Sequence, residues 1–122
     1  MRLLLDTNAL IRWHANQLRP AAVRTVRRAE LVMVSAVSSW EIAVKRAVGK
    51  LRFDDAVGDV LGQNGFQPLP VTVRHGDLLR DLPRHHSDPF DRLLIVQALE
   101  EGLTILTADR AFEPYRVPVM WV

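Results

Sequence analysis

The chain opens with the stretch Leu3-Leu4-Leu5-Asp6-Thr7-Asn8, in which a short apolar run ends in an acid and two polar residues. This pattern predicts a buried strand followed by a turn or a helix cap. Similar apolar runs predict strands over residues 31–34, 103–107 and 117–122. Residues 66–71 predict a shorter strand near an edge of the sheet, because its two prolines cannot donate backbone hydrogen bonds.

Helical patterns lie between these strands. They cover residues 9–15, 20–29, 35–48, 72–82 and 89–101, with a weaker pattern over residues 53–65. Strands that alternate with helices predict parallel βαβ units, whose right-handed crossovers bring the carboxyl ends of the strands to one edge. We therefore expect a single α/β domain over residues 1–122, built on a parallel sheet of about five strands.

Four acidic residues far apart in the chain each fall where a predicted strand ends or the next helix begins: Asp6, Glu41, Asp91 and Asp109. In an open α/β sheet these positions converge at the carboxyl edge, where such folds bind their ligands. Carboxylates brought together repel one another unless a cation lies between them. Mg²⁺ takes such oxygen ligands together with water and phosphate. The pattern therefore predicts a metal-dependent site for phosphoryl transfer.

The composition limits the other possibilities. With 122 residues, 48% of them apolar and 25% charged, the chain is expected to fold as one domain rather than to be disordered. No apolar run approaches the roughly 20 residues of a membrane span, and the first apolar run is too short for a signal peptide. The lack of cysteine excludes disulfides and a cysteine-based zinc site. A cytoplasmic protein without membrane contact is the expectation.

Arginine dominates the positive charge. The formal net charge is only +2, but 14 of the 16 basic residues are arginine. If the four acids gather at one site, 16 basic and 10 acidic groups remain for the rest of the surface. Arginine binds phosphate in a bidentate fork, so this excess favours a nucleic-acid partner. A genome-wide bias in composition explains the arginine content equally well.

Four segments in matching order and spacing resemble PIN-domain ribonucleases, and specifically the VapC-type toxins of bacterial toxin–antitoxin pairs. They span nearly the whole chain, and its length suits a lone PIN domain. The segments are Leu4-Leu5-Asp6-Thr7-Asn8, Ser38-Ser39-Trp40-Glu41-Ile42-Ala43, Asp88-Pro89-Phe90-Asp91-Arg92-Leu93-Leu94-Ile95 and Leu106-Thr107-Ala108-Asp109. Each segment is a weak signal alone, whereas the four together are fairly specific.

The resemblance implies a fold, an activity and partners. Proteins of this family fold as a parallel sheet sandwiched by helices, and they cleave RNA with Mg²⁺ or Mn²⁺, commonly as homodimers. A cognate antitoxin protein holds such a toxin inactive, and its C-terminal segment covers the site. The implied function is therefore a metal-dependent endoribonuclease that acts as a toxin on an RNA substrate.

The same resemblance implies roles for individual residues. The family's metal-binding acids fall on Asp6, Glu41, Asp91 and Asp109. Thr7 matches the polar residue beside the first acid, which helps to place water or a ligand. Asp88 is an extra acid found in part of the family. Phe112 stands where some relatives carry a further acid, which leaves the holding of a second metal open.

Helix capping is the structural alternative for each acid. Asp6 and Asp109 can cap the turns that follow them, and Asp88 before a proline is well placed as an N-cap. Ser38 and Glu41 match a capping box, in which Glu41 would reach back to the Ser38 amide. If the helix begins nearer Ser35 instead, Glu41 lies deeper and is free to reach a metal.

The basic and aromatic residues near the motifs also have structural explanations. Arg92 and Arg110 can neutralise the acids or contact an RNA phosphate, and a solvated salt bridge explains them equally well. His85 and His86 are expected to be loop residues, because adjacent residues rarely share one ligand face. The tryptophans are expected in the core or an interface; they are Trp13, Trp40 and Trp121.

Two other enzyme classes require residues that this sequence lacks. A phospho-receiver domain needs a lysine late in the chain, and none follows Lys50. An aspartate-based phosphatase needs a second aspartate two residues after Asp6, where Asn8 stands. Two alternatives remain: a non-catalytic PIN-fold module that binds RNA or a protein partner, and an RNA-processing nuclease that has no antitoxin.

Overall fold

The computed structural model describes all residues from 1 to 122 and contains one sheet of five strands. All four strand pairings are parallel, in the order β3-β2-β1-β4-β5. The strands are β1 (Arg2–Leu5), β2 (Leu31–Ser35), β3 (Gln67–Leu69), β4 (Thr104–Thr107) and β5 (Val119–Trp121). The predicted parallel five-stranded sheet is therefore confirmed, with the proline-containing strand β3 at an edge.

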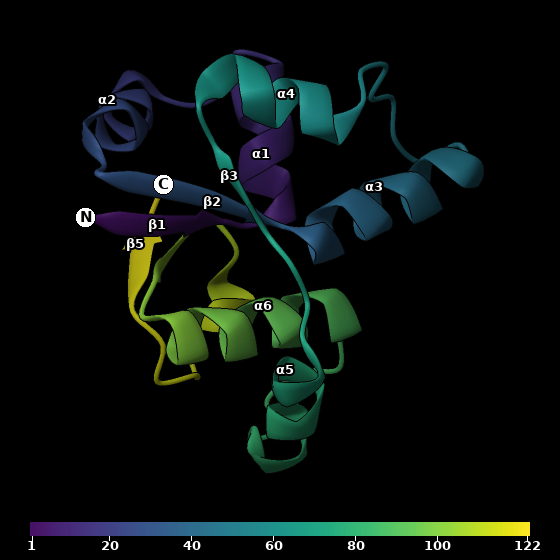
Figure 1. The fold of residues 1–122 in the computed structure, drawn as a ribbon, viewed down its shortest axis with the longest axis vertical. Helices are drawn as coiled ribbons and strands as arrows, with labels where there is room; N and C mark the ends of the chain where they lie inside the picture. Colours follow the sequence, from purple (N-terminus) through teal and green to yellow (C-terminus); the bar gives the residue numbers. More distant parts are fainter.

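Six α-helices cover the two faces of the sheet (Figure 1). Helices α1, α2 and α4 lie on one face, and α6 lies on the other with α5 beside it. Their bounds are α1 (Thr7–His14), α2 (Pro20–Arg28), α3 (Ala36–Ala47), α4 (Val57–Asn64), α5 (Val73–Leu78) and α6 (Pro89–Glu101). None of them combines the length and the apolar character that a membrane span requires.

The position of β1 in the middle of the sheet explains why residues 3–5 are all apolar. Leu3, Leu4 and Leu5 are all fully buried. Leu3 and Leu5 pack in one core cluster with residues of α1, α2 and α4, whereas Leu4 packs with residues of α6 in a second cluster. A strand buried on both faces must be apolar at every position. These three leucines therefore indicate that β1 lies inside the sheet and that helices cover both of its faces.

The register of the sheet sets the position of the acids. Leu5 pairs with Val34 of β2 and with Leu106 of β4, so the ends of these three strands are level. Helices α1 and α3 start directly after β1 and β2. Helix α6 runs back toward the start of β4, so its first turn lies at the same carboxyl edge. The ends of β1, β2 and β4 and the first turns of α1, α3 and α6 therefore meet at the carboxyl edge of the sheet.

The structure differs from the sequence expectation in the connecting regions. The helix predicted over residues 53–65 begins only at Val57, although Phe53 in the preceding loop is buried in the core. The helix predicted over residues 72–82 is divided into α5 and a 3₁₀ turn at Leu79–Asp81. Before α4, a loop buries Phe53 without helical structure, and after α5 the chain continues as a 3₁₀ turn. The apolar periodicity therefore predicted helices that are longer than those observed.

Ser35 is the N-cap that determines where α3 begins. Its Oγ accepts a hydrogen bond from the Val37 amide at 3.0 Å and donates to Gln97 Oε1 at 2.5 Å. Both side chains are buried. We expect Ser35→Ala to lower the free energy of unfolding by about 1–2 kcal/mol, because it removes the cap and leaves Gln97 Oε1 without its donor. Urea unfolding beside Ser39→Ala, an exposed serine of the same helix, tests this; equal losses in both variants contradict it.

Candidate active site

Asp6 lies between β1 and α1 and is almost completely buried, with 3% of its surface exposed. Its Oδ1 accepts a hydrogen bond from the Ala9 amide at 2.7 Å, and its Oδ2 accepts one from the Thr107 hydroxyl. Burial raises the pKa of Asp6 to about 6, against the lowering effect of these two hydrogen bonds. The charges of Asp109 and Glu41 raise it further. Asp6 is therefore both a helix cap and a member of an acidic cluster.

Asp91 lies in the first turn of α6 and is strongly affected by the same cluster. Burial raises its pKa to about 8, and the nearby charge of Asp88 is the next contribution. The charges of Asp109, Asp6 and Glu41 add to the rise. The four acids predicted from the sequence are thus within electrostatic reach of one another, at the edge where the strands end.

Glu41 lies in the second turn of α3 and is 5% exposed. Ser35 caps the helix, so the capping box between Ser38 and Glu41 does not form. Glu41 Oε2 pairs with Lys45 Nζ at 2.7 Å, while Oε1 is buried and has no hydrogen-bond partner. A buried carboxylate oxygen without a partner is costly. This atom is the most direct sign that the site is built to receive a cation or a donor from a ligand.

Lys45 lies beside the acids and was not among the residues expected there. Its hydrogen bond to Glu41 raises its pKa; burial opposes the rise, and the charges of Glu41, Asp88 and Asp91 add to it. The signal that could have found it is the spacing of four residues from Glu41 on one helix. The positive charge of Lys45 therefore partly neutralises Glu41, Asp88 and Asp91.

Thr7 and Ser38 link two helices across the site. The Thr7 hydroxyl donates to the Ser38 hydroxyl at 2.9 Å, and both side chains are buried. Thr7 is therefore at the predicted place, whereas Ser38 is a polar neighbour that the sequence analysis considered only as a cap. No local signal joins two residues 31 positions apart.

Asp88 and Asp109 both act as caps with one oxygen. Asp88 Oδ1 accepts from the amides of Phe90 at 2.9 Å and Asp91 at 3.1 Å, as the N-cap of α6. Asp109 Oδ1 accepts from the Ala111 amide at 2.9 Å and caps a 3₁₀ turn at Arg110–Phe112. Capping leaves Oδ2 of each residue available for a ligand, so the cap and site interpretations do not exclude each other.

The gathered acids do not surround a common point. No three acidic or histidine side chains are close enough together to hold a metal ion as they stand. Their oxygens turn instead to groups of the protein: Asp6 to Thr107, Asp109 to Ala111 and Glu41 to Lys45. The four acids lie within electrostatic reach of one another, and their binding of a cation stays a prediction.

Arg92 takes part in a hydrogen-bond network beside the acids. The residue is 8% exposed, and its guanidinium donates to the carbonyls of Pro83 at 2.9 Å and Leu82 at 3.2 Å, and to the Tyr115 hydroxyl at 3.1 Å. It is therefore an anchor for the loop before α6 and is not free to neutralise the cluster or to bind a phosphate. Arg110 is exposed and stacks on the Trp121 ring at 4.2 Å, and its contact with RNA stays a prediction.

His86 lies in the loop before α6, as expected, but its ring faces the acids. His86 Nε2 is 3.5 Å from Asp91 Oδ2. His85 beside it is exposed, so the two histidines do not form a metal-binding pair. The contact with Asp91 could not be predicted, since nothing in the loop pattern indicates which histidine turns inward.

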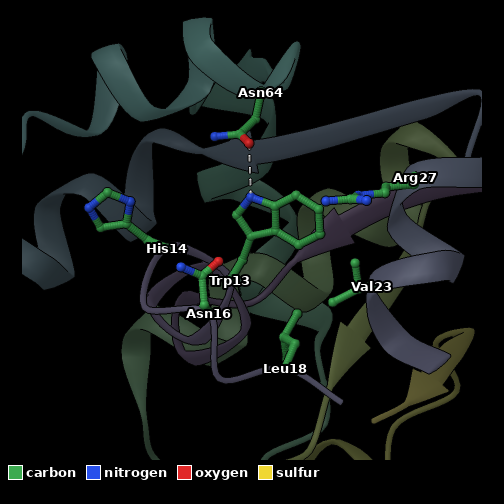
Figure 2. A pocket seen from close by; sticks show the side chains of 7 residues that line it. All are labelled: Trp13, His14, Asn16, Leu18, Val23, Arg27 and Asn64. Carbon is green, nitrogen blue, oxygen red and sulfur yellow. Dashed lines mark hydrogen bonds between the residues drawn. The ribbon is translucent and has the colours of Figure 1, made fainter. Parts of the chain in front are cut away.

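Two surface hollows lie along α1 and share Leu18. The hollow next to the acids is lined by Asp6, Asn8, Ala9, Arg12, Leu18, Ala108, Asp109 and Val122. Figure 2 shows the second, lined by Trp13, His14, Asn16, Leu18, Val23, Arg27 and Asn64. There the Trp13 indole donates to Asn64 Oδ1 at 3.1 Å, which makes Trp13 a wall of the hollow as well as a core residue. Arg12 thus lines the hollow next to the acids, and Arg27 lines the second hollow.

The comparisons with known proteins agree on one family. The PIN domain family model matches residues 3–117. The chain is similar to Ribonuclease VapC22 of Mycobacterium tuberculosis (strain ATCC 25618 / H37Rv), with 27% identity over 124 residues that cover 94% of this chain and 92% of that protein.

Solved structures share the fold at lower identity. VapBC2 from Rickettsia felis, in a crystal structure bound to a DNA fragment from the promoter, has a TM-score of 0.75 at 13% identity and is covered over 98% of each chain. FitAcB from Neisseria gonorrhoeae has a TM-score of 0.69 at 22% identity, over 97% of this chain and 96% of that one. With a family match over nearly its whole length and the matching fold, this chain belongs to the PIN domain family.

Proposed function

We propose that this chain is a metal-dependent endoribonuclease that acts as the toxin of a toxin–antitoxin pair. The observation that carries the proposal is the set of four acids at one sheet edge, in which Glu41 Oε1 is buried without a partner. The similarity to Ribonuclease VapC22 supports RNA as the substrate class. The complexes among the solved structures support a protein partner.

The donor set fits a hard divalent cation. Asp6, Glu41, Asp91 and Asp109 offer only oxygen, which suits Mg²⁺ or Mn²⁺ better than softer metals. When bound, such a metal supplies a water of lowered pKa and stabilises the charge that develops on a phosphate. Phe112 is fully buried in the core and offers no further ligand. The proposed ligands are therefore the four acids, with Asp88 beside them.

The chain's own residues bind the substrate and hold protons. The raised pKa of Asp91, about 8, means that this carboxyl is mostly protonated at neutral pH and releases a proton when a cation binds, whereas Asp6, with a pKa of about 6, is mostly ionised there. The Thr7 and Ser38 hydroxyls lie beside Asp6 as neutral polar groups for water or an RNA oxygen. Arg12 flanks the acids in the hollow along α1, where a phosphate of the RNA backbone fits its guanidinium.

Cleavage of pooled total RNA by the purified protein tests the nuclease function. We expect discrete fragments with Mg²⁺ or Mn²⁺, none with EDTA, and recovery when the metal is restored. Asp59→Asn, which changes an exposed acid of α4, is expected to cleave like the wild type. A folded protein that cleaves no RNA under any condition contradicts the proposal and favours a binding module. Cleavage that is insensitive to EDTA contradicts the metal dependence.

The toxin role and the protein partners need a separate test. Helix α3 and its C-cap residue carry an exposed apolar stripe at spacings of four residues, formed by Trp40 and Val44 of the helix and Val48 at the cap. Such a stripe supports contact with another protein, either an antitoxin or a second copy in a homodimer. We expect induced expression to arrest growth only in an active chain, with relief by a co-expressed antitoxin. Cleavage without growth arrest would favour an RNA-processing nuclease.

A further inference from the structure

His86 carries a buried ring nitrogen that the acids do not explain. Its Nε2 has no hydrogen-bond partner and lies 3.5 Å from Asp91 Oδ2. The side chains of the two residues are 19% and 16% exposed. A buried polar nitrogen aimed at a carboxylate needs an explanation, and the answer depends on whether that nitrogen carries a proton.

The hydroxyl of Tyr115 decides where the imidazole proton lies. Three groups are within hydrogen-bond distance of its oxygen: Arg92 Nη1 at 3.1 Å, the His86 amide at 3.3 Å and His86 Nδ1 at 2.8 Å. The guanidinium and the amide can only donate, so they occupy the two lone pairs of the phenol oxygen. The phenol proton must then go to His86 Nδ1, which accepts it.

A neutral imidazole carries one proton, so an accepting Nδ1 places that proton on Nε2. Nε2 then carries a hydrogen 3.5 Å from Asp91 Oδ2 in heavy-atom distance, which is longer than the hydrogen bonds of this network. The same tautomer leaves Nε2 without a lone pair, so His86 is not a metal ligand through this atom. The network therefore favours a role for His86 in orienting a carboxylate over a role as a metal ligand.

The network is held in place by buried groups on both sides. Arg92 is fixed by the carbonyls of Leu82 and Pro83, and Tyr115 is buried. The rings of His86 and Tyr115 meet edge to face, with centroids 5.4 Å apart and planes at 69°. The direction of donation thus runs from Arg92 to Tyr115 and from Tyr115 to His86, whose Nε2 lies 3.5 Å from Asp91 Oδ2. This gives the buried arginine next to Asp91 in sequence an indirect effect on the site.

We propose that His86 is a positioning residue, whose Nε2–H group donates to Asp91 Oδ2 and so orients Asp91 Oδ1 toward the other acids. The inference rests on the proposed function, since it assumes that Asp91 binds the cation. Hydrogen bonds to a ligating carboxylate commonly contribute about 10–100-fold to metal affinity or activity. We expect a contribution in this range from His86.

A pair of amide variants separates the two nitrogens. The amide of His86→Gln reaches the position of Nε2 and can donate to Asp91. The shorter amide of His86→Asn reaches the position of Nδ1 and contacts only Tyr115. By calorimetric titration with Mn²⁺, His86→Asn should lose about 10-fold in affinity, whereas His86→Gln should retain most of it. His85→Asn, which changes the exposed neighbour, is the matched control and should bind Mn²⁺ like the wild type.

The tautomer itself can be observed by nitrogen NMR of the wild-type imidazole, which needs no variant and no activity. We expect a protonated Nε2 and an unprotonated Nδ1, and Tyr115→Phe should release this preference while keeping the ring packing. A protonated Nδ1 in the wild type overturns the inference, as does equal Mn²⁺ affinity in folded His86→Asn and wild type. RNA cleavage in the same samples separates the two hypotheses, because an inactive protein with the expected tautomer and Mn²⁺ affinities would contradict only the proposed function.

Discussion

Asp6→Asn is expected to lower kcat/KM for RNA cleavage by at least about 10²–10³-fold, because a catalytic cation supplies several kcal/mol of transition-state stabilisation. Asp6 is the central acid of the cluster, between the middle strand and α1, and both neighbouring charges raise its pKa. The amide has nearly the same size but carries no charge, so it binds a cation poorly. Initial rates on a defined RNA fragment measure the loss.

The same variant should be more stable than the wild type without metal. The pKa of Asp6 rises from 3.8 to about 6 on folding, mainly because the carboxylate is buried. Ionised Asp6 therefore costs the fold on the order of 3 kcal/mol at neutral pH. The amide removes this cost and can still cap Ala9, but it gives up the hydrogen bond from Thr107, so we expect a net gain of about 1–2 kcal/mol.

Stability and activity together make the interpretation of Asp6→Asn unambiguous. Urea unfolding with EDTA gives the stability, and Asp59→Asn should change it by less than about 0.5 kcal/mol as an exposed control. A variant that loses activity only because it unfolds would undermine the assignment of Asp6. A folded variant that cleaves RNA like the wild type would remove Asp6 from the site.

The second large effect concerns pH. Without a divalent cation, the free energy of unfolding should fall as pH rises from about 4 to about 8. The folded-state pKa values of Asp6 and Asp91 are about 6 and about 8, above the ordinary 3.8, so the folded protein binds more protons in this window. Stability from such groups is complete below the ordinary pKa and is lost as pH rises through the raised one. Asp6 alone accounts for on the order of 3 kcal/mol of this fall.

A divalent cation should reverse the fall at the upper end of the window. Binding to the folded state alone stabilises by about 2.7 kcal/mol at 100 times the dissociation constant, and more cation binds as the acids lose protons. Thermal and urea unfolding across the pH range, with Mg²⁺ or with EDTA, measures both effects. The difference between wild type and an Asp6→Asn, Asp91→Asn double variant isolates the two acids. A difference that grows in favour of the wild type with rising pH in EDTA would contradict the account.

Much of the fold could be predicted because its signals are local. Strand β1 is an uninterrupted apolar run because both of its faces are buried, and α6 begins at Pro89 and ends before Gly102, as proline and glycine indicate. Helix α4 was overestimated, since the residues before Val57 form a loop that buries Phe53 without helical hydrogen bonds. Periodicity cannot separate these two ways of burying one aromatic side chain.

The candidate site was predictable in its acids but not in the groups that surround them. Asp6 and Asp109 follow strands, Asp91 lies in the first turn of α6 and Glu41 lies one turn into α3, so topology brings all four to one edge. The contacts of Ser38 and His86 join residues far apart in the chain, and no local pattern encodes them. Arg92 lies beside Asp91 in sequence, but its guanidinium bonds to the loop before α6 and to Tyr115, because neighbours on a helix point in different directions.

The binding of Mn²⁺ to the purified, metal-free protein tests the central claim most directly, by calorimetric titration or by the resonance signal of free Mn²⁺. The account predicts saturable binding by the wild type and by Asp59→Asn, with proton release, and large losses of affinity in folded Asp6→Asn, Glu41→Gln and Asp91→Asn. A folded wild-type protein that binds no Mn²⁺, or binds it equally well after these substitutions, would show that the acids at the carboxyl edge do not form a metal site.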